Sequence, residues 1–325
     1  MAILVTGGAG YIGSNMTLAL LDAGREVVVL DNLSKGPRAA VPAAAAFVEG
    51  DVGDQALVGR LIAEHGVTAV LHFAGSIVVP ESVTEPLKYY DNNTGRTRAL
   101  IEACVRGGLG QFIFSSTAAV YGMPEVSPTP EDAPLAPISP YGASKMMSER
   151  MLMDTAAAHD LRYGILRYFN VCGADPAGRA GQREPQGTHL IKAAVETALG
   201  RRPELVVNGT DFPTRDGTAI RDYIHVTDLA QAHLAALAHL EAGGDSLLFN
   251  CGDGHGYTVR EVVAAVEAEL GRRLSVRDGP RRAGDPAVLI ADVRRVGQLL
   301  GWRPKFDDLR FIVRTALDFE ASIVA

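Results

Sequence analysis

The most constraining feature of this chain is a glycine-rich segment near its N-terminus, between an apolar run and a helical pattern. Residues 2–5 (AILV) are typical of a strand buried on both faces. The segment Gly7-Gly8-Ala9-Gly10-Tyr11-Ile12-Gly13 follows, and then a leucine-rich helical pattern that stops at Gly24. Residues 26–30 (EVVVL) predict a second buried strand, and Asp31 follows it directly. This order of strand, glycine turn, helix, strand and acid predicts a dinucleotide-binding βαβ unit.

Each part of this unit has a physical role in binding a dinucleotide. Glycines at Gly7, Gly10 and Gly13 permit a tight turn, a close approach of the backbone to a pyrophosphate, and a helix N-terminus directed at it. A carboxylate at Asp31 would accept hydrogen bonds from the adenosine ribose and repel a 2′-phosphate. The sequence therefore predicts NAD in preference to NADP.

The alternation of strands and helices continues for about half of the chain. Further strands are predicted at 46–51, 69–75, 111–116 and 163–170, with helices at 54–65, 91–106 and 141–159. Six strands separated by helices predict an α/β fold with a Rossmann-type doubly wound parallel sheet, whose ligand lies at the carboxyl ends of the strands. The residues at those ends are Asp51, Phe73-Ala74-Gly75, Ser115-Ser116-Thr117 and Asn170.

The character of the chain changes after Asn170. Residues 172–186 are rich in Gly, Pro, Arg and Asp and predict a loop at a domain boundary. Shorter elements follow, with helices near 189–199, 228–240 and 259–270 and strands at 205–207 and 247–250. We predict that residues 1–170 form an NAD-binding Rossmann domain, to which later segments around 216–250 can return. Residues 171–325 then form mainly a smaller, mixed α/β substrate lobe over the carboxyl edge of the sheet.

Composition limits the classes of partner. A net charge of −7 without a basic tract argues against a nucleic-acid partner, and no apolar run approaches the length of a membrane span. The eight histidines show no metal-binding spacing, so no metal is expected. The three cysteines, Cys104, Cys172 and Cys251, are far apart and predict buried, reduced thiols. With no signal peptide at the N-terminus, we predict a cytoplasmic protein that binds a small molecule and no membrane.

A second motif, SPYGASK at 139–145, supplies candidate chemistry. Pro140 suits the first turn of a helix and Ser139 can cap it, which places Tyr141 and Lys145 at i and i+4 on one face. A phenol has a reference pKa of about 10, and a neighbouring ammonium lowers that pKa. Most Tyr-x-x-x-Lys pairs are ordinary helix neighbours. Downstream of a dinucleotide motif, however, this pair predicts a tyrosine that acts as a general acid and base.

Nine motifs occur in an order that resembles the extended short-chain dehydrogenases/reductases. They are TGGAGYIG at 6–13, HFAG at 72–75, YYDNN at 89–93, FSSTAAVYG at 114–122, SPYGASK at 139–145, RYFN at 167–170, DGT at 216–218, RDYIHV at 221–226 and PRRAGD at 280–285. Within that family the chain is most similar to the epimerases that act on a UDP-sugar, and the resemblance extends over nearly the whole chain.

The resemblance implies a set of residues for NAD. These are Gly7, Gly10, Tyr11, Ile12 and Gly13 for the pyrophosphate, Asp31 and Asn32 for the adenosine ribose, Asp51 and Val52 for the adenine, and Phe73, Ala74, Gly75, Asn92, Ser115, Tyr141, Lys145 and Phe169 for the rest of the cofactor.

The resemblance also implies a reaction and a substrate site. Thr117, Tyr141 and Lys145 match the catalytic trio, which would oxidise a UDP-sugar transiently at C4 and so interconvert UDP-glucose and UDP-galactose. The residues implied to bind the substrate are Thr117, Tyr141, Asn170, Leu190, Arg221, Tyr223, Arg282 and Asp285. Members of the family form homodimers, through helices that correspond to 91–106 and 141–159 here.

Three positions depart from the pattern of relatives. Ile77 stands where some carry Lys, and His189 where some epimerases have Asn. Leu289 aligns with a position that influences whether an N-acetyl group fits, and its bulk favours UDP-glucose and UDP-galactose over N-acetylated sugars.

Three other functions compete with this reading. Dehydratases of the superfamily place an acid after the catalytic Thr, and Ala118 in that position disfavours them. A uronate 4-epimerase or a decarboxylase would need a pocket for a C6 carboxylate, which the sequence excludes less firmly. A non-catalytic NAD-sensing protein would not need Thr117, Tyr141 and Lys145 together, so it ranks last.

Overall fold

The largest sheet has seven strands in the order β10-β6-β5-β4-β1-β2-β3. Five neighbouring strands of this sheet pair in parallel, in the order β3, β2, β1, β4 and β5. This order is that of a Rossmann fold, extended by β10 beside β6. The strand bounds are β1 Ala2–Thr6, β2 Glu26–Asp31, β3 Ala46–Glu49, β4 Val67–His72, β5 Gln111–Thr117, β6 Arg162–Tyr168 and β10 Leu247–Cys251.

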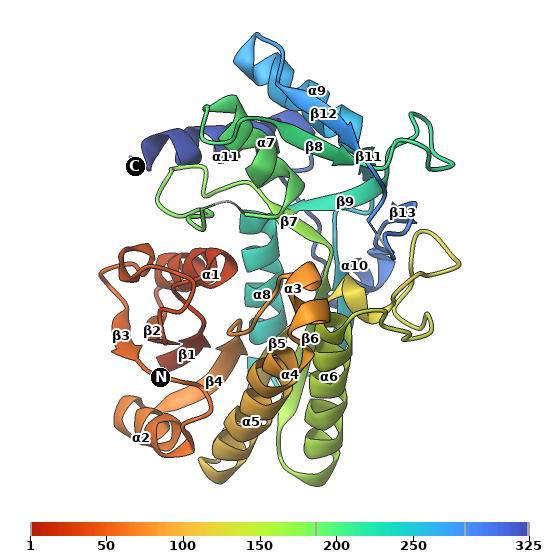
Figure 1. Ribbon diagram of the computed structural model, residues 1–325. Coiled ribbons are helices and arrows are strands. Elements are labelled where there is room, and N and C mark those ends of the chain that lie inside the picture. The colour runs from red at the N-terminus through yellow and green to blue at the C-terminus, as the bar shows by residue number, and fades with distance from the viewer. Residues whose placement is uncertain (1, 186, 283, 324–325) are drawn as a thin grey trace. The chain divides into compact units, whose positions relative to one another are not determined.

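The protein is described as a computed structural model, which covers residues 2–185, 187–282 and 284–323. The chain divides into two units (Figure 1). The first holds residues up to Gly122, Leu135–Arg167 and Ala230–Phe249. The second holds Met123–Pro134, Tyr168–Leu229 and the chain from Asn250 on. Gln186 of the predicted boundary loop and Ala283 of the PRRAGD motif lie outside the described residues.

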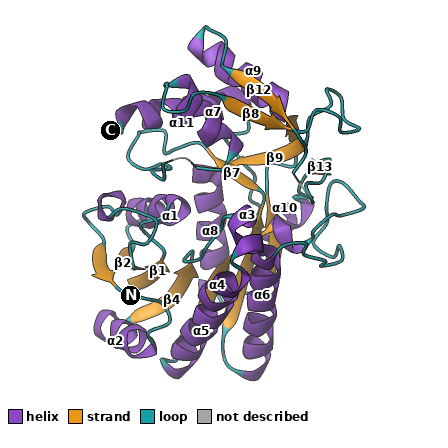
Figure 2. Ribbon diagram, viewed as in Figure 1, coloured by secondary structure: helices purple, strands orange, loops and turns teal. Residues whose placement is uncertain are grey.

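Helices cover both faces of the sheet of the first unit, as expected for a doubly wound fold. Strands β1 and β2 lie between α1 and the layer that contains α2 and α5 (Figure 2). A buried apolar cluster fills the latter interface, with Leu4, Leu100 and Phe112 fully buried. The helix bounds are α1 Tyr11–Asp22, α2 Gln55–His65, α3 Val79–Thr84, α4 Pro86–Tyr89, α5 Arg96–Arg106, α6 Pro140–Ala158 and, spanning both units, α8 Val226–Glu241.

The start of α6 follows the sequence-based expectation. Pro140 stands in the first turn, and the hydroxyl of Ser139 accepts a hydrogen bond from the Gly142 amide at 3.2 Å. A Cβ added at Gly142 would lie 2.5 Å from the carbonyl oxygen of Ala119, so only glycine allows α6 to begin this close to the turn Ala118–Val120 that follows β5. The helix that carries Tyr141 is therefore packed directly against the end of β5.

The second unit is built from short strands and helices around its own core. Strands β7, β9, β11 and β13 form one small sheet, and β8 and β12 another. Helices α7, α9 and α11 share a second buried cluster, which includes Val195, Val262 and Ile312. The bounds are β7 Asn170–Cys172, α7 Leu190–Ala198, β8 Leu205–Asn208, β9 Ile220–His225, β11 Gly256–Thr258, α9 Val259–Leu270, β12 Val276–Gly279, β13 Val288–Leu289, α10 Arg294–Leu300 and α11 Leu309–Ser322.

The structure differs from the sequence-based assignment in several places. The strand predicted at 247–250 is β10, which becomes the seventh strand of the large sheet because residues 230–249 return to the first unit. Residues 123–134 lie inside the range predicted for the first domain but belong to the second unit, where Thr129 bridges to Ala291. The sequence analysis predicted neither strand β9, at 220–225, nor the short elements α3, α4, β11, β12, β13, α10 and α11. The helix predicted over 91–106 begins as a π-helical turn, Tyr90–Gly95, before α5.

Candidate active site

The glycine turn is packed so tightly that it tolerates no side chain at two positions. Gly7 has φ +72°, and a Cβ there would lie 2.5 Å from the amide nitrogen of Ala74. A Cβ at Gly13 would lie 2.1 Å from the carbonyl oxygen of Gly7. The turn thus brings the segment after β4 against the segment after β1, and α1 begins at Tyr11 immediately beyond it. Two stretches predicted to bind the same cofactor are neighbours.

The acidic residue after β2 is placed for the ribose end of a dinucleotide. The Asp31 carboxylate accepts hydrogen bonds from the amides of Ala9 (2.9 Å) and Leu33 (2.8 Å), which fix its orientation beside the glycine turn. The side chain of Asn32 donates to Asp51 across 3.3 Å, so the acids after β2 and β3 are linked. Each carboxylate oxygen has two lone pairs, so Asp31 retains capacity for ribose hydroxyls.

Two observations refine the predicted adenine end. Arg96 of α5 forms an ion pair with Asp51, a partner that sequence analysis did not identify. Val52 is 7% exposed and belongs to the hydrophobic core of the first unit. Taken together, a turn without room for side chains, a helix N-terminus and an oriented acid fit a bound NAD.

The predicted catalytic trio meets at the edge of the same sheet. Thr117 is the last residue of β5, and its side chain is hydrogen-bonded to that of Tyr141 in the first turn of α6. One turn later, the ammonium of Lys145 donates to the carbonyl oxygen of Ser115 at 2.8 Å and lies 4.8 Å from the centre of the Phe114 ring. A strand end and a helix start thus converge on one group of three side chains.

Burial dominates the electrostatics of this trio. It raises the pKa of Tyr141, and the hydrogen bond with Thr117 acts in the opposite direction. Burial also lowers the pKa of Lys145 to about 8, against the attraction of Glu149. Sequence analysis expected Lys145 to lower the pKa of Tyr141. The pKa of Tyr141 is instead raised, because a buried phenolate loses its hydration.

Sequence analysis missed three residues that support the trio. The ring of Tyr89 stands edge-on to that of Tyr141, with centroids 6.4 Å apart. The Asn93 amide donates to the hydroxyl of Ser144 at 3.1 Å, and its oxygen accepts from the Ser76 amide at 2.7 Å. The motif YYDNN contains Tyr89 and Asn93. His72, the first residue of the motif HFAG, is buried and hydrogen-bonded to Thr6 and Thr97, but the motif gave it no role.

Asn92 and Phe73, both predicted to contact the cofactor, also contact side chains of the first unit. Asn92 donates to the hydroxyl of Ser76 at 3.0 Å, and the ring of Phe73 lies 5.1 Å from that of His233 in α8. Phe169, the remaining cofactor residue implied by the resemblance, belongs to the second unit, where its amide bonds to Cys251.

In the second unit, the structure brings together four of the predicted substrate-binding residues. Asn170 on β7 is the register partner of Tyr223 on β9, and its side chain donates to the carbonyl of Asp222 at 3.0 Å. Arg221 precedes Tyr223 on the other side of Asp222 and forms an ion pair with Asp285. These residues lie on a common strand pair or are bonded to it.

Four further positions of interest differ in their placement. Leu289 on β13 is the register partner of Arg221, so the residue expected to influence sugar choice is adjacent to a residue expected to bind phosphate. Arg282 is exposed, in a turn that Asp285 closes by a backbone hydrogen bond. Leu190 begins α7 and packs on the core of the second unit, and His189 caps that helix without a side-chain bond to it.

Among the described residues, no group of histidines, cysteines and acids is arranged to hold a metal ion. Within the same part of the chain, no helix combines the length and apolarity needed to cross a bilayer.

A Rossmann sheet with a glycine cradle, an oriented Asp and a Thr–Tyr–Lys trio at one edge defines a nicotinamide-dependent enzyme of the short-chain dehydrogenase/reductase type. Comparison with known proteins agrees. The chain belongs to the NAD dependent epimerase/dehydratase family, whose model matches residues 3–252.

Individual relatives match over the full length. A UDP-glucose 4-epimerase of Azospirillum brasilense is 58% identical over 99% of this chain and 92% of its own. The crystal structure of UDP-glucose 4-epimerase from Brucella ovis in complex with NAD has a TM-score of 0.95 at 46% identity, covering 98% of both chains. A UDP-Glc/GlcNAc 4-epimerase from Campylobacter jejuni has a TM-score of 0.86 at 48% identity, covering 98% of this chain and 99% of its own. These matches confirm the family resemblance and the cofactor predicted from the sequence.

Proposed function

We propose that this chain is a UDP-glucose 4-epimerase, which interconverts UDP-glucose and UDP-galactose with bound NAD. The observation that carries the proposal is the hydrogen-bonded pair of Thr117 and Tyr141 beside a buried Lys145, on a sheet edge shaped for a dinucleotide. Bound NAD would accept a hydride from C4 of the sugar and return it to the opposite face of the same carbon.

The side chains of the chain itself handle the proton. Tyr141 takes the proton of the sugar 4-hydroxyl and later returns it, while Thr117 hydrogen-bonds to the same oxygen. Lys145, held by the Ser115 carbonyl, supplies the positive charge that favours the phenolate.

The second unit supplies groups suited to a nucleoside diphosphate. Arg221 and Arg282 provide guanidinium donors for the diphosphate, and the pairing of Arg221 with Asp285 fixes its orientation. The remaining residues in the proposed UDP site are Asn170, Leu190 and Tyr223.

The test of this function is direct. Purified protein is incubated with UDP-galactose and a trace of NAD, and UDP-glucose is quantified. We expect conversion without net NADH accumulation, because the cofactor is restored in each turnover. Protein that binds NAD but forms no UDP-glucose would refute the proposal, and UDP-glucuronate would then be the substrate to try, since a uronate 4-epimerase or decarboxylase is the next candidate. A dehydratase stays disfavoured, because the residue after Thr117 is the buried Ala118.

We propose that the sugar range excludes N-acetylated substrates. The support is the bulk of Leu289, whose strand position is beside Arg221. We expect a lower kcat/KM for UDP-N-acetylglucosamine than for UDP-glucose, and a gain for the N-acetyl sugar in Leu289→Ala. The structural neighbour from Campylobacter jejuni is a UDP-Glc/GlcNAc 4-epimerase, so the comparison of the two sugars tests whether this chain differs from that neighbour in substrate range. Equal kcat/KM values for the two sugars would overturn it.

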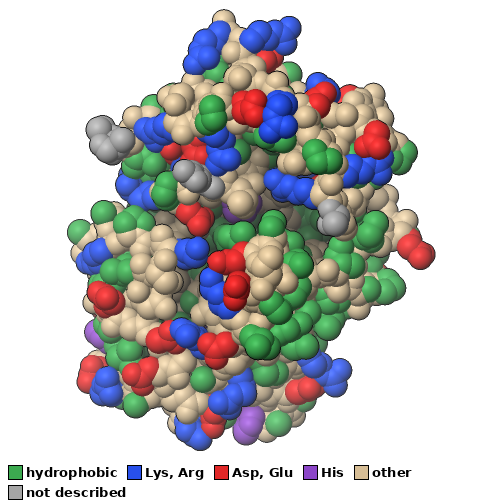
Figure 3. Space-filling view, viewed as in Figure 1, with side chains coloured by type: hydrophobic (Ala, Val, Ile, Leu, Met, Phe, Trp, Pro, Cys, Tyr) green, Lys and Arg blue, Asp and Glu red, His purple; other side chains and the backbone are tan. Residues whose placement is uncertain are grey.

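We propose that the protein forms a homodimer through the face that includes α5 and α6. Hydrophobic side chains gather on the surface over α3 and α4 (Figure 3). Leu87 is 80% exposed there, and Met147 on α6 is 42% exposed. A large exposed apolar patch is typical of an interface. Met147→Asp should yield monomers in sedimentation, whereas Leu299→Asp, at an equally exposed position of the second unit, should not. A wild-type monomer would contradict the proposal.

We also propose a cytoplasmic location. Cys104, Cys172 and Cys251 are all buried and unpaired, and burial raises the pKa of Cys104 to about 12. Unpaired thiols of this kind are typical of a reducing compartment.

A further inference from the structure

A buried ion pair lies one helical turn beyond the catalytic lysine. Glu149 of α6 and Arg167 of β6 pair at 2.7 Å, and their side chains are only 1% and 3% exposed. The Arg167 Nε donates to the other carboxylate oxygen at 3.0 Å, so the contact is bidentate. A bidentate guanidinium–carboxylate pair fixes geometry as well as charge.

The pair is bonded to the strand and the turn that carry the catalytic groups. The hydroxyl of Ser116, between Ser115 and Thr117 on β5, donates to Glu149. Arg167 also donates to the phenol oxygen of Tyr121 at 2.9 Å, and its guanidinium lies 5.0 Å from the centre of that ring. Tyr121 follows the short helix that begins after Thr117. The network thus joins α6, β5, β6 and the turn after β5.

Lys145 and Glu149 are bonded to adjacent residues of β5. Lys145 donates to the carbonyl of Ser115, and Glu149 accepts from the side chain of Ser116. At i and i+4, the ammonium and the carboxylate lie on one face of α6. The helix is therefore held to the strand at two successive turns, and both contacts are charged.

Of the groups that face Lys145, Glu149 provides the negative charge. His72 on β4 stacks with Phe114, and burial with the nearby lysine lowers its pKa to about 3, so it stays neutral. Tyr141 on the same helix has a raised pKa and is neutral as well. Arg167, from β6, is positive and lies behind the carboxylate, and Tyr89, from α4, has a raised pKa. Removal of the carboxylate therefore leaves no negative charge to oppose the effect of burial, which lowers the pKa of Lys145.

We infer that Glu149 and Arg167 are positioning residues for the proposed reaction. Their pair holds α6 in register with β5, and the carboxylate keeps Lys145 charged in a site that would otherwise favour its neutral form. This inference rests on the proposed function, and it assigns the alkaline limit of activity to the loss of charge on Lys145.

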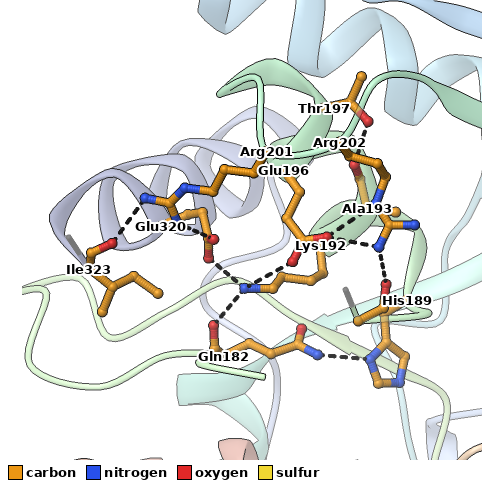
Figure 4. A network of polar contacts seen from close by, with 11 residues as sticks. Gln182, His189, Lys192, Ala193, Glu196, Thr197, Arg201, Arg202, Glu320 and Ile323 are labelled. Atoms are coloured by element: carbon orange, nitrogen blue, oxygen red, sulfur yellow. Dashed lines mark hydrogen bonds and ion pairs between the residues drawn. The ribbon is translucent and has the colours of Figure 1, made fainter. Parts of the chain in front are cut away.

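The second unit offers a matched control. There Lys192 pairs with Glu320 at 2.5 Å and with Glu196 at 3.6 Å, and Arg201 also binds Glu320 (Figure 4). The side chain of Glu320 is 5% exposed, so it is buried much as Glu149 is. Glu320 lies on α11, however, and its partner Lys192 lies on α7, across the second core. Glu320→Gln removes a buried carboxylate of the same kind from a region without proposed catalytic residues.

The experiment measures kcat and KM against pH for the full-length protein and for Glu149→Gln. We expect the alkaline limb of kcat to move to lower pH by roughly one unit, with KM for UDP-galactose unchanged. Glu320→Gln should keep the wild-type limb even where its thermal stability falls. A limb that stays in place in Glu149→Gln, or that moves equally in Glu320→Gln, would overturn the inference.

A double variant separates positioning from folding. Breaking one side of a buried pair leaves an uncompensated charge, whereas removing both charges avoids it. We therefore expect Glu149→Gln with Arg167→Met to fold better than Glu149→Gln alone. Loss of the Arg167 charge favours the Lys145 ammonium, so the alkaline limb of the double variant should lie between those of Glu149→Gln and the wild type. A limb displaced further than in Glu149→Gln alone would contradict the electrostatic part of the inference.

A second readout needs no turnover. NMR titration of protein labelled with ¹³C-lysine follows the protonation of the buried Lys145 amine across pH without a reagent that has to reach it, and Lys145→Met identifies its resonance. In Glu149→Gln the titration curve should shift to lower pH, and an unchanged curve would contradict the inference. If the wild-type protein converts no UDP-galactose, the proposed function fails, while this measurement still tests the link between Lys145 and Glu149.

Discussion

Both units of this protein contain buried ion pairs, but the pairs lie in different surroundings. In the first unit, Glu149 pairs with Arg167 one helical turn after Lys145, and it accepts a hydrogen bond from Ser116, the neighbour of Thr117 on β5. In the second, Lys192 and Glu320 join two helices across a hydrophobic core. Buried ion pairs are weak evidence of stability, because desolvation costs about as much as the attraction returns. Their position relative to reacting groups, more than their strength, indicates what each pair does.

The comparison extends to the proposed sites. The first unit holds the proposed cofactor cradle and the proposed catalytic trio, whereas the second holds the guanidinium groups proposed to bind the nucleotide. Substitutions in the trio should therefore alter kcat, those in the cradle should alter cofactor affinity, and those in the second unit should alter KM or stability. Four predictions test this division, in order of decreasing effect.

The largest effect is expected at Tyr141, the acid and base of the first unit. Tyr141→Phe should lose about a hundredfold or more in kcat, because one positioned acid–base group contributes roughly 10²–10⁴. KM and NAD content should stay near wild type, measured by initial rates and by the cofactor released on denaturation. Turnover close to wild type would end the catalytic assignment.

In the second unit, Asp222 should link stability to pH. Its carboxylate is fully buried and accepts from the amides of Asp253, Gly254 and Ala291, and burial raises its pKa to about 6. The folded state then binds a proton that the unfolded state has released. This stabilising contribution, present at low pH, is lost as pH rises from the ordinary value near 4 through 6.

The size of that loss is of the order of 3 kcal/mol, from a shift of about two units. Denaturant titrations at several pH values, compared with those of Asp222→Asn, isolate the contribution. The free energy of unfolding of the wild type relative to the variant should fall between pH 4 and 6 and level off above it. A difference that is independent of pH would refute this assignment.

Arg221 should affect substrate affinity more than turnover. Arg221→Met removes the guanidinium that Asp285 orients, and charge-assisted hydrogen bonds contribute about 1.5–3 kcal/mol, so KM should rise roughly 10- to 150-fold. Arg260→Met is the control. It removes a surface ion pair between Arg260 of α9 and Asp278 of β12, and it should leave KM unchanged. An unchanged KM in Arg221→Met would remove this residue from the substrate site.

The smallest effect is expected at the cofactor preference of the first unit. Asp31, oriented by the amides of Ala9 and Leu33, should repel a 2′-phosphate. Protein stripped of its cofactor should therefore bind NAD at least about tenfold more tightly than NADP. Fluorescence titration with both reduced cofactors measures the ratio, and Asp31→Asn should narrow it. Equal affinities in the wild type would contradict the role of Asp31.

The sequence by itself determined the features that depend on neighbours a few residues apart. The strand–glycine–helix order placed the cofactor cradle, and the spacing of Tyr141 and Lys145 placed both on α6. The cap at Ser139 was likewise predicted and is present. Such features can be predicted from the sequence because local steric and hydrogen-bonding rules determine turns, caps and helix faces.

Only the tertiary structure decided which distant residues meet. Arg96 is 45 positions from Asp51, and Glu149 is 33 positions from Ser116, so no sequence periodicity predicts either contact. The seventh strand, β10, joins the sheet only because the chain returns from the second unit. Burial likewise decided the direction in which the pKa of Tyr141 moves. Desolvation and long-range pairing depend on what surrounds a group in space, and a linear sequence does not contain that information in readable form.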